Sequence, residues 1–227
     1  MFKKMKLGPK LMVIGVVLTL VPLIILGFAA YLQNRSALEV SRAESIKLAY
    51  TDLDHIAEGV YRMCQSQQEV LEKQMLHALN VARDIVKRNG GFSFNEESVT
   101  WTAINQYTKH PSLIKLNKML SGYTWLGQTR ESGKTVPIVD EVQKLTDVTC
   151  TIFQRMNSDG DMLRVATNVL KEDGSRAIGT YIPAVNPDGK PNPVISTVVK
   201  GQTFNGRAYV VNKWYITAYE PIFIMEN

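Results

Sequence analysis

The chain has 227 residues, of which 45% are hydrophobic and 21% charged, a composition that suits a globular domain with an additional segment and excludes disordered and collagen-like chains. The net charge of +5 is unevenly distributed. Lys3, Lys4, Lys6 and Lys10 precede the first acidic residue, Glu39, and the chain beyond residue 32 carries 22 basic against 21 acidic residues. The basic charge therefore belongs to an N-terminal tail and does not indicate nucleic-acid binding.

A hydrophobic segment follows this tail of residues 1–10. Leu11–Tyr31 contains no charged residue, and a helix of that length spans about 30 Å, the thickness of a bilayer core. We therefore predict a transmembrane helix at 11–32. Because the lysines precede it, the positive-inside rule places the tail in the cytoplasm, anchors the chain by a single pass in the inner (cytoplasmic) membrane and exports the remainder. A cleaved signal peptide is the alternative, since Gly27 and Ala29 fit a cleavage site, although the apolar run is long for one.

The segment at 33–91 predicts a long extracytoplasmic helix. Residues 36–89 contain no proline and only one glycine, Gly59, and their apolar residues recur mostly every three or four positions. Such a helix would be about 80 Å long, more than a single domain covers, so we expect part of its apolar stripe to pack on a second copy in a homodimer. Asn89, Gly90 and Gly91 predict its end.

The remainder, 92–227, predicts a sheet. Residues 92–147 mix short elements with loops and include a short helix at Val139–Leu145. An alternating pattern then predicts strands at 148–156, 162–170, 176–182, 207–211 and 214–222. Turn sequences at 157–160 and 172–175 suit antiparallel neighbours, and Asn192–Pro193 predicts a brief helix that ends at Gly201. A long helix followed by an antiparallel sheet is an α+β fold.

The sequence gives little support for catalysis or metal binding. His55, His77 and His110 lack the spacing of a helical metal site. Cys64 and Cys150 form no CxxC motif and lie among apolar neighbours, which favours two buried thiols over a disulfide. No nucleophile-elbow or HExxH motif occurs. We therefore expect a protein that is not an enzyme, with no catalytic residue, metal or cofactor.

Arg164 is the strongest candidate for ligand binding. An arginine among apolar strand residues is costly to desolvate without an anion, although a carboxylate of the chain could also pair with it. The other candidates, which could equally be core or structural residues, are Tyr181, Arg207, Tyr209, Trp214 and Tyr215. We hypothesise a small carboxylate-bearing metabolite, with Arg164 on the anion and the aromatic residues as walls and donors.

Several motifs occur in a characteristic order. They are WTAINQYT at 101–108, WLG at 125–127, VDEV at 139–142, TIFQ at 151–154, RVATNV at 164–169, GSRAIGT at 174–180 and YITAYEPI at 215–222. Together they resemble the extracytoplasmic Cache sensor domain of bacterial methyl-accepting chemotaxis receptors, of the fused Cache-three/Cache-two type, over about residues 36–222. The resemblance implies a long helix leading into a PAS-like antiparallel sheet that binds small metabolites such as organic acids or amino acids.

The resemblance also implies segments beyond Ile222. A final strand, a second membrane helix and a cytoplasmic output module would follow, so we expect the sensor domain at 92–227 to be incomplete at its C-terminus. The leading functional hypothesis is the extracytoplasmic small-molecule sensing domain of a membrane-anchored chemoreceptor or related signalling protein. The alternative is a truncated, membrane-tethered binding module that dimerises with full-length receptors and does not signal itself.

Overall fold

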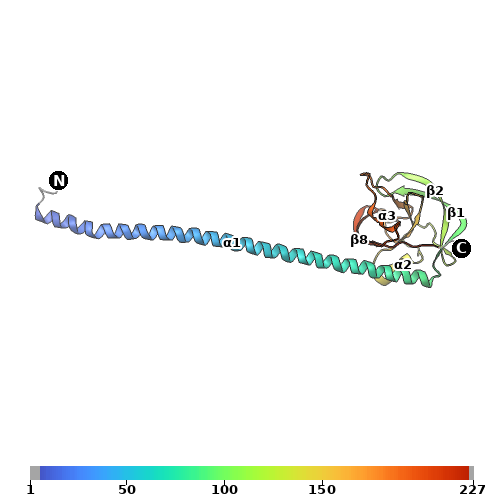
Figure 1. The fold of residues 1–227 in the computed structure, drawn as a ribbon, viewed down its shortest axis with the longest axis horizontal. Coiled ribbons are helices and arrows are strands. Elements are labelled where there is room, and N and C mark those ends of the chain that lie inside the picture. Colours follow the sequence, from blue (N-terminus) through green and yellow to red (C-terminus); the bar gives the residue numbers. More distant parts are fainter. Residues whose placement is uncertain (1–5, 225–227) are drawn as a thin grey trace. The chain divides into compact units, whose positions relative to one another are not determined.

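The computed structural model describes residues 6–224 (Figure 1). Tertiary contacts divide the chain between Gln65 and Ser66 into two units, and each is described by itself. The first unit contains the N-terminal part of helix α1 (Leu7–Arg88). The second contains the C-terminal part of α1 and all other elements.

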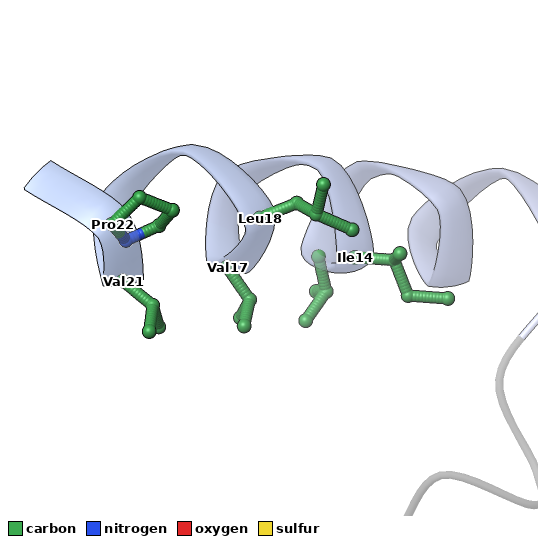
Figure 2. Close-up of a pocket in the computed structure, with 6 residues that line it drawn as sticks. Ile14, Val17, Leu18, Val21 and Pro22 are labelled. Atoms are coloured by element: carbon green, nitrogen blue, oxygen red, sulfur yellow. The ribbon is translucent and has the colours of Figure 1, made fainter.

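Helix α1 includes the predicted membrane segment Leu11–Tyr31. Among the described residues it is the one helix long and apolar enough to cross a membrane. The helix continues through Pro22 without interruption. Figure 2 shows a shallow hollow beside this proline, lined by the side chains of Ile14, Val17, Leu18 and Val21. These purely aliphatic side chains suit contact with lipid.

Helix α1 runs without a break through the two predicted segments, the transmembrane helix at 11–32 and the long helix at 33–91. The residues that join them, from Gln33 to Leu38, include no glycine or proline that would end a helix. The predicted end of α1 is confirmed. Gly90 and Gly91 have positive φ angles of 89° and 76°, and the amide of Gly91 donates to the carbonyl of Val86 over 2.9 Å.

The main sheet of the second unit has the strand order β3-β2-β1-β6-β5-β4. Its strands are β1 (Phe92–Asn105), β2 (Pro111–Ser121), β3 (Thr124–Trp125), β4 (Thr151–Arg155), β5 (Met162–Thr167) and β6 (Thr180–Ile182). All neighbours pair antiparallel except β1 and β6, which pair parallel at Ile104 and Asn105. The predicted α+β class, with a mostly antiparallel sheet, is confirmed.

Strands β7 (Phe204–Val210) and β8 (Lys213–Tyr219) pair only with each other and form a separate two-stranded sheet, which we call the β7–β8 hairpin. They correspond to the strands predicted at 207–211 and 214–222. The turns at 157–160 and 172–175 join antiparallel neighbours as predicted. Only three residues of the predicted strand 176–182 form β6, because a turn at Ala177–Thr180 with a positive φ at Gly179 precedes it.

The prediction of short elements and loops at 92–121 is wrong. Strands β1 and β2 span 14 and 11 residues and form a long antiparallel pair. The pairing shifts register between Phe94 and Ser98, and the residues there are exposed. This irregularity removes the simple hydrophobic alternation by which strands are recognised.

The core lies between the main sheet, the end of α1 and helix α2 (Val139–Thr146). Buried side chains from each element meet there, including Ile85 of α1, Trp101 of β1, Val142 of α2 and Leu163 of β5. Helix α3 (Pro193–Val198) begins as predicted: the Asn192 side chain accepts hydrogen bonds from the amides of Val194 and Ile195 over 3.0 and 3.3 Å.

Candidate functional site

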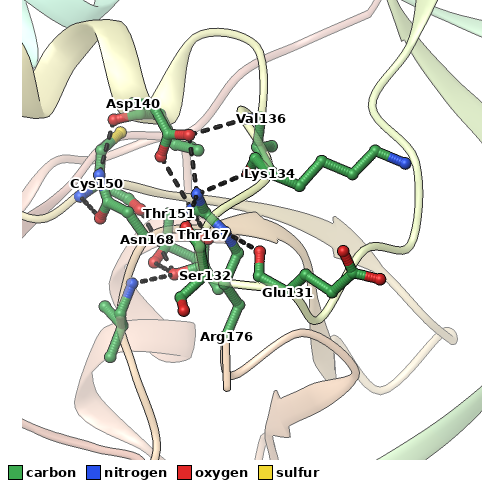
Figure 3. A network of polar contacts seen from close by, with 12 residues as sticks. Glu131, Ser132, Lys134, Val136, Asp140, Cys150, Thr151, Thr167, Asn168 and Arg176 are labelled. Carbon is green, nitrogen blue, oxygen red and sulfur yellow. Dashed lines mark hydrogen bonds and ion pairs between the residues drawn. The ribbon is translucent and has the colours of Figure 1, made fainter. Parts of the chain in front are cut away.

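Arg176 is one of two arginines with buried side chains, and its charge is fully compensated. It forms a two-point ion pair with Asp140, with 2.8 Å from Nη1 to Oδ1 and 2.8 Å from Nη2 to Oδ2. Its remaining nitrogen–hydrogen groups donate to backbone carbonyls, including those of Glu131 and Thr167 (Figure 3). Arg176 thereby ties the loop ahead of α2 to the strand region and has a structural role.

Arg164, on β5, is also buried, at 0% exposure, but its charge is not compensated. Its Nη1 donates to the hydroxyl of Thr180 on β6. Its Nε and Nη2 have no hydrogen-bond partner within residues 6–224, and no carboxylate in that range pairs with it. The guanidinium carbon lies 4.9 Å from the centre of the Phe153 ring. Burial lowers the pKa of Arg164 to about 10, so the side chain remains charged at neutral pH.

The β7–β8 hairpin approaches Arg164 through Tyr219, at the end of β8. The Tyr219 ring centre lies 5.9 Å from that of Phe153, the residue that stacks on Arg164. Burial raises the pKa of Tyr219, and the opposing effect of the nearby Arg164 charge is smaller. Tyr219 is therefore a neutral phenol at neutral pH and cannot act as the missing counter-ion.

A cavity of about 60 Å³ lies farther along the same hairpin. The residues that give it its chemical character are Gln106, Tyr107, Asn192, Arg207, Tyr209 and Trp214. Its lining contains a cation, several amides and aromatic rings but no carboxylate. This electrostatic character suits a neutral or anionic group better than a cation.

The aromatic residues of the cavity contact one another. Tyr107 stacks on Tyr209 with ring centres 5.4 Å apart, and Trp214 meets Tyr209 edge-on at 5.9 Å. The guanidinium carbon of Arg207 lies 5.5 Å from the centre of the Trp214 ring. Trp214 is 63% exposed, so this aromatic cluster extends from the cavity to the surface.

Gln106 provides a buried acceptor that is not used within the chain. Its Nε2 donates to the carbonyl of Tyr209 over 3.2 Å, whereas its Oε1 has no partner among the described residues. Asn192 Nδ2 lies 2.8 Å from Asn186 Oδ1 and 3.4 Å from the hydroxyl of Tyr107. The cavity therefore combines apolar walls with a few placed polar groups, but its volume of about 60 Å³ is well below the roughly 300–1,000 Å³ of a typical small-molecule site, so in this conformation it would hold only a small part of a ligand.

Comparison with protein families gives one match. The model of the Cache 3/Cache 2 fusion domain matches residues 39–225. The chain belongs to this family. The resemblance deduced from the motifs is thereby confirmed. No curated protein and no solved structure matches the chain. Cache domains are typically extracellular sensors of small molecules and are generally ligand-binding modules rather than enzymes.

The structure brings together three of the six candidate ligand residues of this Cache domain. Arg207, Tyr209 and Trp214 all line the cavity. Arg164 lies near the end of the β7–β8 hairpin and does not line the cavity. Tyr181 packs against the core and accepts a hydrogen bond from Asn105 over 3.2 Å. Tyr215 is 37% exposed and follows Trp214 on β8, so the side chains of Trp214 and Tyr215 point to opposite faces of the hairpin.

The sequence did not lead us to four polar residues that line the cavity. Gln106 and Tyr107 belong to the WTAINQYT motif, Asn186 lies in a loop, and Asn192 was predicted only as a helix cap. The motif was a usable signal for the first two, because polar residues directly after a strand commonly lie at a sheet end where sites form. Nothing in the local sequence of Asn192 distinguishes its second role.

The two cysteines of the Cache chain are free thiols. The expectation that both are buried is wrong for Cys64, which is exposed on α1 because none of the described residues 6–224 covers its face of the helix. Cys150 is partly buried, and desolvation raises its pKa to about 12. No group of three or more His, Cys, Asp or Glu side chains suited to a metal is present within residues 6–224.

Proposed function

We propose that this Cache domain senses a small carboxylate-bearing metabolite outside the cytoplasmic membrane, as part of a chemoreceptor or related transmembrane signalling protein. The observation that carries the proposal is Arg164, a fully buried guanidinium with two nitrogen donors unused within residues 6–224. The family, the apolar part of α1 and the cavity beside the hairpin support the same function.

The contrast between the two buried arginines favours an external anion. A buried charge costs several kcal/mol unless it is paired and hydrogen-bonded. Arg176 meets this requirement with Asp140, whereas Arg164 has one hydroxyl and one aromatic face. A carboxylate is planar and accepts two parallel hydrogen bonds from a guanidinium, so it would satisfy both free donors of Arg164.

The cavity adds a second set of contacts for such a ligand. Arg207 supplies a second positive charge, and Tyr209 and Trp214 supply aromatic walls. Gln106 Oε1 would accept a hydrogen bond from a hydroxyl or amino group. Arg164 and the cavity both lie against the β7–β8 hairpin, so one ligand site extending along the hairpin would involve both.

Membrane anchoring and dimerisation complete the proposed function. The lysines ahead of Leu11 support a cytoplasmic N-terminus and a periplasmic or otherwise extracytoplasmic sensor. Large apolar side chains stay exposed along α1 beyond the membrane segment, among them Ile46, Leu53, Ile56 and Val60. Exposed apolar residues at helical spacing are typical of a helix that packs on a second copy, which supports a homodimer.

The test begins with a thermal-shift screen of small carboxylates and neutral analogues on the full chain in detergent. For a ligand found in this way, Arg164→Ala should weaken binding at least tenfold, because a charge-assisted hydrogen bond contributes about 1.5–3 kcal/mol. Arg62→Ala is the matched control, since Arg62 is exposed on the first unit and pairs only with Glu58. Unchanged affinity in an Arg164→Ala protein with wild-type circular dichroism and melting temperature would exclude Arg164 from the ligand site.

A further inference from the structure

The β7–β8 hairpin is firmly attached at its turn. Lys109 Nζ donates to the carbonyls of Gln106 and Val211 over 2.7 and 2.9 Å, and Asn212 Nδ2 donates to Glu172 Oε1 over 2.9 Å. Val210 and Val211 are buried in a small apolar cluster with Val169 and Ala177. Polar and apolar contacts thus fix this end of the hairpin to the rest of the second unit.

The opposite end of the hairpin is held differently. There Phe204 pairs with Tyr219, and neither β7 nor β8 shares ladder hydrogen bonds with the main sheet. Tyr219 contacts Phe153 above Arg164. The residue after Tyr219, Glu220, forms a two-pronged ion pair with Arg83 of α1. The Arg83 Nη2 lies 2.6 Å from Glu220 Oε2, and its Nε lies 3.2 Å from Oε1.

These contacts place an enclosed cation, Arg164, beside the Tyr219 end of the hairpin. Arg164 is 0% exposed, so an anion can reach its free donors only if a neighbouring side chain moves. Tyr219, which contacts Phe153 next to Arg164, is the neighbour that belongs to the hairpin. Because Glu220 follows Tyr219 directly, a movement of Tyr219 also displaces Glu220 from Arg83. A movement that opens the anion site therefore also changes the contact with α1, because Tyr219 and Glu220 are consecutive residues.

We propose that the Tyr219 end of the β7–β8 hairpin is a cover over Arg164, and that the Glu220–Arg83 ion pair couples its opening to α1. This inference rests on the proposed function for the identity of the ligand but not for the cover itself. An anion that binds only the open form would weaken the Glu220–Arg83 contact, and loss of this contact would strengthen anion binding by the same factor.

The expected effect is small but measurable. The Arg83 side chain is 61% exposed and that of Glu220 28%, and ion pairs of this kind contribute little because solvent screens them. Breaking the pair should therefore increase the open population roughly twofold to fivefold.

Thiol labelling measures the open population without any ligand. Thr180→Cys places a thiol beside Arg164. The 227-residue chain is used in detergent, with its native cysteines replaced by serine. Neutral iodoacetamide should label this thiol roughly twofold to fivefold faster after Arg83→Gln or Glu220→Gln, and the exchanged pair Arg83→Glu with Glu220→Arg should restore the slow rate. Arg62→Gln should leave the rate unchanged. Thr167→Cys, in the same background, places a control thiol at a buried position next to Arg176. This thiol should be labelled at the same slow rate in all variants, which controls for global unfolding.

Acetate, with its neutral analogue acetamide, then tests the coupling. Acetate should bind Arg83→Gln more tightly than wild type by the factor seen in the labelling, and acetamide should not bind either. Equal labelling of Thr180→Cys with and without the Glu220–Arg83 pair would overturn the cover. Faster labelling with unchanged acetate affinity would overturn the coupling. If acetate and the carboxylates of the screen all fail to bind while labelling still responds to Arg83→Gln, the proposed ligand class fails and the cover stands.

Discussion

Arg164 and Arg176 are both buried, yet they should respond oppositely to the same substitution. Arg176→Met leaves Asp140 without its partner and removes several carbonyl hydrogen bonds, so we expect a loss of about 3–5 kcal/mol in the free energy of unfolding. Arg164→Met removes a charge that lacks a counter-ion, so the free energy of unfolding without ligand should stay the same or increase. Urea unfolding of the full chain in detergent measures both.

An Arg164→Met protein as unstable as Arg176→Met would show that Arg164 has a counter-ion within the chain. Glu226, which lies outside the described residues, is then the first carboxylate to test, with Glu226→Gln. If Glu226→Gln alone reproduced the loss of stability, the charge of Arg164 would be satisfied internally and would no longer support an external anion.

The two cysteines should differ in reactivity. Only a thiolate is nucleophilic, and burial raises the pKa of Cys150 to about 12, so few Cys150 side chains are ionised at pH 8. Cys64 is exposed. Ellman's reagent should therefore modify one thiol per native chain at pH 8 and two in denaturant, and Cys64→Ser should abolish the native reaction. A native Cys64→Ser protein that still reacts rapidly would contradict the burial of Cys150.

At the scale of elements, local sequence signals predicted the structure well wherever one residue type determines the backbone. Gly90 and Gly91 adopt the positive φ that ends α1, Asn192 caps α3, and the turn at 157–160 joins β4 to β5. The register shift in β1 leaves no such signal, because it depends on pairing with β2. Strands β1 and β2 were therefore missed.

The site was predictable only in part for the same reason. The apolar neighbours of Arg164 correctly indicated a buried arginine, and alternation correctly grouped Arg207 with Tyr209. The separation of Arg164 from the cavity depends on how the β7–β8 hairpin lies against the main sheet, which no local pattern encodes. The unused acceptor of Gln106 likewise results from contact with Tyr209, 103 positions away.

Helix α1 carries the prediction of a homodimer. Single cysteines placed at successive positions from 36 to 89, in a chain without Cys64 and Cys150, should cross-link with a period near 3.5, because two packed helices bring the same face together every 3.5 residues. Maxima are expected at apolar positions such as Ile46, Leu53 and Val60, which are exposed within the chain. Positions such as Glu58 and Arg62 should cross-link weakly. Uniformly absent cross-linking, with a monomeric mass in detergent, would contradict the dimer.

At the scale of the whole molecule, the position of the membrane determines which ligands the sensor meets. The lysines at 3–10 and the uncharged segment at 11–31 predict that the N-terminus is cytoplasmic and that residues beyond 33 lie outside. Anchoring by α1 would then connect the membrane segment to the Glu220–Arg83 contact through one uninterrupted helix. The orientation can be tested independently of any ligand.

An alkaline phosphatase reporter, which folds only outside the cytoplasm, should be active when fused after residue 90, and the fusion should stay in the membrane fraction with its original N-terminus. A second experiment changes the distribution of positive charge on the two sides of the membrane segment and so tests what sets the orientation. Replacing Lys3, Lys4, Lys6 and Lys10 by glutamine, with basic residues added after Tyr31, should reduce the reporter activity, because the charge bias sets orientation. An active but soluble fusion with a new N-terminus near Tyr31 would show that the segment is a cleaved signal peptide. The sensor would then be exported without an anchor, and α1 could no longer transmit hairpin opening to the membrane.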